Sequence, residues 1–165
     1  MAQKDYMMRW TVLSDNRSNN CRLSTEHGLS IFLETEKYRI LLDTGASDLF
    51  IKNAEMLSID LGSVDYVFIS HGHSDHAGGL CCCLEQNRRS KVVVSSEAMN
   101  GIFFSKRGNL HSITTVWPEI SKDRLCTVDQ SCEIADGIYV IAHIHQNHPM
   151  PKGNKNLYVQ DACGN

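Results

Sequence analysis

Four side chains that can bind a metal ion lie within six residues of one another. They are His71, His73, Asp75 and His76, in the order H-x-H-x-D-H. Imidazole and carboxylate groups together suit zinc, iron or manganese, and the sequence does not choose among these metals. A polar loop with surface histidines is a poor explanation for this composition and order, so the segment predicts a metal site.

The cluster follows residues 66–69, whose apolar side chains predict a buried strand. A strand holds the loop after it in a fixed position, which a metal site requires. If the chain stays extended past the strand, His71 and His73 face the same side and can bind one ion. Asp75 and His76 then turn toward a second position, and the ions of two-metal sites are about 3.5 to 4 Å apart.

Strands and helices alternate along the chain on both sides of this cluster. The strand pattern of residues 29–34 and 38–42 predicts an antiparallel hairpin that ends at Asp43. Helical spacing predicts a helix that begins at Ser47 as its N-cap and continues to Leu61. The remaining predictions are strands at 9–13, 91–95, 124–128, 137–142 and 156–159, helices at 78–87 and 96–99, and irregular chain over 101–123.

The H-x-H-x-D-H segment, with Ala77-Gly78-Gly79-Leu80 after it, resembles the metal-binding motif of the metallo-β-lactamase superfamily. Leu41-Leu42-Asp43-Thr44-Gly45 is similar to the strand-end motif that precedes it in that superfamily. Residues 15–16, 26–30, 53–54 and 70–73 resemble one subgroup, the dihydropterin-ribofuranosyl-aminobenzene phosphate synthase-like proteins. Ser74 and Ala77 depart from the subgroup, which often has tyrosine and threonine there, and this leaves the substrate open.

The resemblance implies an α/β (α+β) fold, the αββα sandwich of the metallo-β-lactamases. It implies that residues 1–165 form a single, partial domain that corresponds to the N-terminal half of this sandwich. In the complete fold the motif residues are ligands of a two-metal site, with zinc the expected metal and iron or manganese the alternatives. Asp75 is expected to be both a ligand and a catalytic residue, and Asp43 to brace the metal-binding loop.

The implied activity is hydrolysis of a phosphate ester or a related small molecule by a metal-activated water. No motif matching the ligands of the second half occurs before Asn165. We therefore expect a chain truncated from a longer enzyme, with an incomplete metal site and an exposed apolar face that a homo-oligomer would cover. The alternative is a non-catalytic remnant that binds metal or dimerises.

Other histidines could lie near the site. His143 and His145 are two residues apart at the end of an apolar strand and His148 follows them, so they could act as substitute ligands. The favoured interpretation is that these three are rim or surface residues. His27 and His111 are interpreted as structural or rim residues, and His27 is, like the other three, a possible substitute ligand.

Charge and composition exclude several classes of function. The chain has 16 basic and 19 acidic residues and no block of like charges, so no nucleic-acid partner is implied. No apolar run is long enough to cross a bilayer, and the sequence predicts a cytoplasmic protein. Its seven cysteines, three of them adjacent at 81–83, predict reduced thiols that pack as small apolar groups or are exposed, and nothing favours a thiol-based role.

Overall fold

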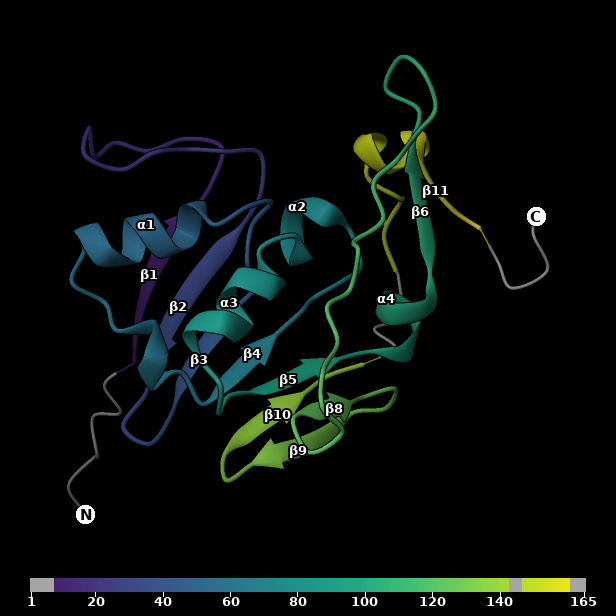
Figure 1. Cartoon of the computed structure of the whole chain (residues 1–165). Coiled ribbons are helices and arrows are strands. Elements are labelled where there is room, and N and C mark those ends of the chain that lie inside the picture. Colours follow the sequence, from purple (N-terminus) through teal and green to yellow (C-terminus); the bar gives the residue numbers. More distant parts are fainter. Residues whose placement is uncertain (1–7, 143–146, 161–165) are drawn as a thin grey trace.

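A six-stranded mixed sheet organises the computed structural model, which describes residues 8–142 and 147–160 (Figure 1). Its strands lie in the order β1-β2-β3-β4-β5-β8. The β1/β2 and β2/β3 pairs are antiparallel, and β3, β4, β5 and β8 run parallel. The strands are β1 (Arg9–Ser14), β2 (Ser30–Glu34), β3 (Arg39–Leu42), β4 (Tyr66–Phe68), β5 (Lys91–Val94) and β8 (Leu125–Thr127).

The β2–β3 hairpin confirms the prediction from the sequence, with Ile31 opposite Leu42 and Glu34 opposite Arg39. Its turn is closed by the Thr35 hydroxyl, which accepts the backbone N–H of Tyr38 at 2.9 Å. The hairpin therefore fixes the point at which the chain leaves β3, directly before Asp43.

Two helices cover one face of this sheet, α1 (Leu49–Met56) and α3 (Leu80–Gln86), as Figure 1 shows. Apolar side chains of both helices pack on apolar side chains of the strands and form the core. Its buried members include Leu13, Phe32, Leu41, Phe50, Ile51, Ala54, Val67, Leu80, Cys83, Val92 and Val94. Burial of this apolar surface is the main favourable term in folding, so the core fixes the strand ends that carry the site.

The predicted extent of the first helix was wrong at both ends. Its N-cap is Asp48, one residue after the predicted Ser47, although the Ser47 hydroxyl still accepts the backbone N–H of Leu49 at 3.1 Å while it donates to Glu26 Oε2 at 2.6 Å. It ends at Met56, where the chain turns through Ser58 at a φ of 57°. The apolar side chains after the turn still reach the core, and Leu61 does so from a separate 3-10 helix, η1 (Leu61–Ser63).

The segment predicted to be irregular, residues 101–123, contains β6 (Ile102–Ser105) and β7 (His111–Ser112). Together with β11 (Leu157–Gln160) they form a three-stranded sheet in the order β11-β6-β7. Local pattern could not reveal it because Phe104 pairs with Tyr158, far along the chain. The other short helices are α2 (Ser74–Ala77), α4 (Ser96–Asn100) and η2 (Lys152–Asn156). A further hairpin pairs β9 (Cys132–Ala135) with β10 (Ile138–Val140), and β9 was not predicted from the sequence.

The cysteines of the described part of the chain are free thiols, as predicted. Along the 81–83 run, Cys81 is exposed, Cys82 is half-buried and Cys83 belongs to the core. As for the predicted lack of a membrane span, no helix within residues 8–142 and 147–160 is long and apolar enough to cross a bilayer.

We expect Cys83 to resist alkylation in the folded protein while Cys81 reacts. Burial raises the pKa of the Cys83 thiol to about 12, so about one thiol in ten thousand is ionised at pH 8. Brief treatment with iodoacetamide at pH 8, followed by peptide mass spectrometry, measures both sites in one sample. Modification of Cys83 at the rate of Cys81 in the native state would contradict its place in the core.

Candidate metal centre

The predicted site lies at the carboxyl ends of two neighbouring parallel strands. Asp43 follows β3, and the loop of residues 70–76, here called the metal loop, follows β4. The ends of parallel strands meet at one edge of a sheet, which is the usual place for a ligand site in α/β proteins. The backbone N–H of Asp43 donates to the carbonyl of Phe68 at 2.8 Å, so the two strand ends are directly joined.

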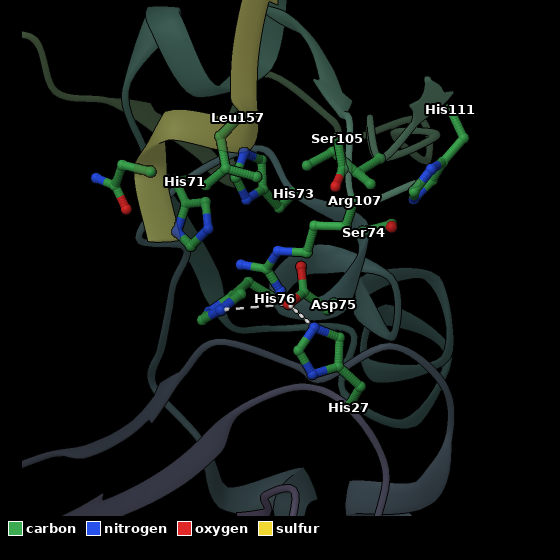
Figure 2. Close-up of a pocket in the computed structure, with 12 residues that line it drawn as sticks. His27, His71, His73, Ser74, Asp75, His76, Ser105, Arg107, His111 and Leu157 are labelled. Atoms are coloured by element: carbon green, nitrogen blue, oxygen red, sulfur yellow. Dashed lines mark ion pairs between the residues drawn. The ribbon is translucent and has the colours of Figure 1, made fainter. Parts of the chain in front are cut away.

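Two backbone conformations present the motif side chains. His73 is still extended, with φ −75° and ψ 143°, whereas Asp75 and His76 lie on the short helix α2 that begins at Ser74. The ring centroid of His71 lies 4.4 Å from that of His73 and 4.2 Å from that of His76. The structure therefore brings the motif residues together at one pocket, as Figure 2 shows.

Asp43 lies beneath this cluster and is almost completely buried, at 1% exposure. Its Oδ1 accepts the backbone N–H of Ser70, and its Oδ2 accepts the Ser70 hydroxyl and His76 Nδ1, each at 2.7 Å. Because the Ser70 hydroxyl donates to Asp43, its lone pair accepts the N–H of His71 Nδ1 at 2.8 Å. One carboxylate thus orients both rings, directly for His76 and through Ser70 for His71.

These contacts leave Nε2 of His71 and of His76 with a free lone pair, which is the form that binds a metal ion. Burial lowers the pKa of His71 to about 4, and the nearby His76 and His73 rings add to this effect. Burial also lowers the pKa of His73. For His76, burial acts to lower the pKa, but the hydrogen bond and charge of Asp43 outweigh it and the pKa is raised.

His27 lies on the pocket wall opposite β6, on the segment between β1 and β2. Its Nδ1 is 2.8 Å from Asn16 Oδ1, and its Nε2 is 3.4 Å from Asp75 Oδ2. His76 Nε2 lies 3.8 Å from the same Asp75 oxygen. His27, which we expected at the rim, thus contacts the carboxylate of Asp75 in the motif.

The far wall of the pocket comes from the β6–β7 segment and from η2 and β11, and the cavity between the walls is about 680 Å³. The metal loop is joined to this wall by backbone hydrogen bonds from Ser74 N–H to the Ile113 carbonyl at 2.7 Å and from Thr115 N–H to the Gly72 carbonyl at 3.0 Å. This wall contributes pocket residues that the sequence pattern did not predict, namely Ser105, Arg107, Ile113, Asn154 and Leu157. No local motif marks them.

The other histidines have different positions. His111 is on the far wall, where its Nδ1 lies 3.0 Å from the Asn109 carbonyl oxygen. His148 is exposed and does not line the pocket, so nothing in its position supports a role as a substitute ligand. His143 and His145 lie outside the described residues.

The donor set fits a divalent metal ion in residue type and ring orientation. Within the described ranges, however, no three His, Cys, Asp or Glu side chains are gathered so that they could hold an ion as they stand. The Nε2 atoms of His71 and His76 and the Asp75 carboxylate face one pocket, and they would have to come closer together to bind an ion.

Comparison with known proteins agrees with this geometry. Residues 24–81 match the metallo-β-lactamase superfamily, a segment that contains both the Asp43 motif and the metal loop. A solved metal-dependent hydrolase of the β-lactamase superfamily, Tm1679, superposes with a TM-score of 0.71 at 30% identity over 94% of this chain. The chain therefore has a metallo-β-lactamase-like fold, and its motif segment is similar to that superfamily. Members of this superfamily typically depend on divalent metal ions.

Two curated relatives have different names and activities. A 7,8-dihydropterin-6-methyl-4-(beta-D-ribofuranosyl)-aminobenzene-5'-phosphate synthase of Methanocaldococcus jannaschii is 36% identical over 85 residues, which are 48% of this chain and 29% of the relative. An anaerobic nitric oxide reductase flavorubredoxin of Aliivibrio salmonicida is 33% identical over 96 residues, which are 56% of this chain and 19% of the relative. The chain spans 55% of the Tm1679 chain and less than a third of either curated relative.

We expect Asp43→Asn to lower the free energy of unfolding by about 2–3 kcal/mol. The buried carboxylate accepts three hydrogen bonds, whereas the amide would replace one accepting oxygen by an NH₂ group that faces donors. Asparagine tolerates the φ of 56° at this position, so the change isolates the loss of the acceptor. Urea unfolding followed by circular dichroism measures the effect. The control is Asp48→Asn, at an exposed partner of Lys52, for which little change is expected; equal midpoints for the two variants would contradict the role of Asp43.

Proposed function

We propose that this chain is the metal-binding part of a metal-dependent hydrolase that acts on a phosphate ester or a related small anionic molecule. The observation that carries the proposal is the convergence of His71, His73, Asp75 and His76 on one pocket above the buried carboxylate of Asp43. Zinc is the metal we propose, with iron or manganese as alternatives that the same donors accept.

His71 and His73 would hold one metal position, and Asp75 and His76 a second. A bound divalent ion supplies Lewis acidity and lowers the pKa of water toward 7. Residues of the chain orient the two rings for metal binding. Asp43 accepts the Nδ1 proton of His76 and Ser70 that of His71, so Nε2 of each ring is free. Asp75, which is 24% exposed, keeps a carboxylate at the edge of the pocket where substrate would enter.

Arg107 supports an anionic substrate. Figure 2 shows its side chain reaching from the β6–β7 segment into the pocket toward Asp75 and His76. Its guanidinium has no hydrogen bond or ion pair with any residue of the described ranges. A guanidinium matches the geometry of a phosphate group through paired N–H donors, so Arg107 would bind the anion beside the metal positions.

The name of the Methanocaldococcus jannaschii relative contains a 5'-phosphate, which agrees with a phosphate-bearing substrate for this chain as well. The alternative proposal is a metal-binding or dimerising module without turnover. It is favoured by the lack, in the described ranges, of three gathered ligands. Metal binding without metal-dependent turnover in the experiment below would support this alternative.

We expect His71→Ala to lower the metal content of the purified chain and to abolish metal-dependent hydrolysis of bis(p-nitrophenyl) phosphate. The reason is that a metal position with two protein ligands cannot lose one and remain occupied. Metal analysis and a phosphodiesterase assay are run on the same preparations, with His148→Ala as the matched control away from the pocket. Equal metal content and activity in the His71 variant and the unsubstituted chain would refute the proposed function.

We expect Arg107→Ala to raise KM for this phosphodiester about tenfold or more, the factor that corresponds to one charged hydrogen bond, with a smaller effect on kcat. Lys106→Ala removes a neighbouring exposed cation that does not line the pocket and serves as the control. Steady-state kinetics of both variants provide the comparison. A common small change in both would show that only the general positive charge of this segment matters.

A further inference from the structure

We infer that the substrate carries a second phosphate group, and that Lys152 and Lys155 of η2 bind this group at the far wall of the pocket. The inference rests on the function proposed above, which places the reacting phosphate at the metal loop and Arg107, and it deepens that function. It narrows the substrate class to small molecules that carry two phosphate groups.

The far wall has charge of a single sign. Residues 101–118 and 147–160, which contain β6, β7, η2 and β11, include no aspartate or glutamate. None of their lysine and arginine side chains forms an ion pair within the described residues, whereas Arg9 and Lys52 elsewhere in the fold are paired with carboxylates. The exposed cations of the wall are Lys106, Arg107, Lys152 and Lys155. The whole chain has 19 acidic and 16 basic residues, so this positive charge is a local property of the wall.

The helix η2 lies directly beside Arg107. A Cβ added to Gly153 would be 3.8 Å from Arg107 Nη2, so the backbone of η2 approaches the guanidinium and still leaves it exposed. The backbone N–H of Lys106 donates to the Asn156 carbonyl at 2.8 Å and joins η2 to the end of β6. Figure 1 shows η2 as the yellow helix next to β6 and β11. A molecule bound by Arg107 is therefore within reach of lysine side chains on η2.

The two lysines lie on one face of η2. They are three residues apart in a 3-10 helix, in which the side chains at positions i and i+3 lie one above the other. Like charges side by side repel each other, and an anion between them removes this repulsion. Clefts lined by charge of one sign also raise the local concentration of ions of the opposite sign. Lys152 and Lys155 flank Asn154, which lines the pocket, so they form an anion-binding pair at its mouth.

Ser105 is an independent indication of a ligand at this wall. The residue is 5% exposed and lines the pocket, and its hydroxyl has no hydrogen bond with any described residue. Burial of a hydroxyl without a hydrogen bond is unfavourable, so an oxygen atom of a ligand fits at this position. Figure 2 shows Ser105 on the same wall as Arg107. The wall therefore offers a neutral donor besides its cations, and phosphate oxygens accept from both kinds of donor.

The pocket has room for two phosphate groups. Its cavity of about 680 Å³ extends from Asp75 on the metal loop to Asn154 on η2 and Leu157 on β11. Sites for small molecules typically have volumes of about 300–1,000 Å³. One substrate molecule can therefore place one phosphate at the metal loop and the other at η2.

Titration with inorganic phosphate and inorganic pyrophosphate tests the inference without an activity assay. The chain is labelled with nitrogen-15, stripped of metal by a chelator that is then removed, and titrated at low ionic strength, where screening is weak. Two-dimensional NMR spectra give the affinity for each anion and show which amide signals move. The test variant is Lys152→Ala/Lys155→Ala. The matched control is Lys106→Ala/Lys122→Ala, which also removes two exposed positive charges but leaves η2 unchanged and removes no residue that lines the pocket.

We expect pyrophosphate to bind the unsubstituted chain at least tenfold more tightly than phosphate, the factor that one added charged hydrogen bond supplies, and to move the amide signals of residues 152–156. The Lys152→Ala/Lys155→Ala variant should lose this preference and keep its affinity for phosphate, while the control keeps the preference. The substituted lysines are exposed, so both variants should fold, which circular dichroism checks.

Equal affinities of the unsubstituted chain for the two anions would overturn this inference, and so would an equal loss of preference in the test variant and the control. Either result, together with loss of metal and hydrolysis in His71→Ala, would leave the proposed function intact. A preference for pyrophosphate that depends on Lys152 and Lys155, with unchanged metal content and activity in His71→Ala, would support the anion-binding pair and refute the hydrolase.

Discussion

The carboxylate of Asp43 is buried, and both of its oxygens accept donors from the metal loop. An unpaired carboxylate in this position would lose its hydration without compensation, so the contacts of Ser70 and His76 with it stabilise the folded state. The same contacts join the end of β3 to the loop after β4 and set the tautomers of two rings. Stability and site geometry therefore depend on one group, and a change at Asp43 affects both.

The opposite wall of the pocket is held by contacts between segments that lie far apart in the chain. The β6–β7 segment contacts the metal loop through backbone hydrogen bonds at Gly72 and Ser74, and β6 pairs with β11. Gly72 is required at this junction because a Cβ there would lie 2.2 Å from the Ala98 carbonyl oxygen. Arg107 enters the pocket from this wall, so the group that we propose for anion binding is placed by a different part of the fold from the metal-binding groups.

The similarity to the metallo-β-lactamase superfamily covers the metal loop and Asp43, and the named relatives include a synthase and a nitric oxide reductase as well as a hydrolase. The segment that these proteins share therefore does not specify a single reaction. In this chain the features that narrow the chemistry are local: a guanidinium that is unpaired within the described residues, and the two lysines of η2 on the same wall.

The sequence by itself determined the resemblance to the metallo-β-lactamases, the β2–β3 hairpin and the H-x-H-x-D-H cluster, because a metal motif and an alternating apolar pattern are local properties of neighbouring residues. The sequence pattern predicted too long a first helix. Leu57 and Leu61 have the same spacing whether a helix or a turn places them against the core. Only the tertiary structure decided that β6 pairs with β11, that Arg107 enters the pocket, and that His27 meets Asp75. Those contacts join residues far apart in the chain, and their positions follow from how the sheet and its loops pack, which no short window of sequence contains.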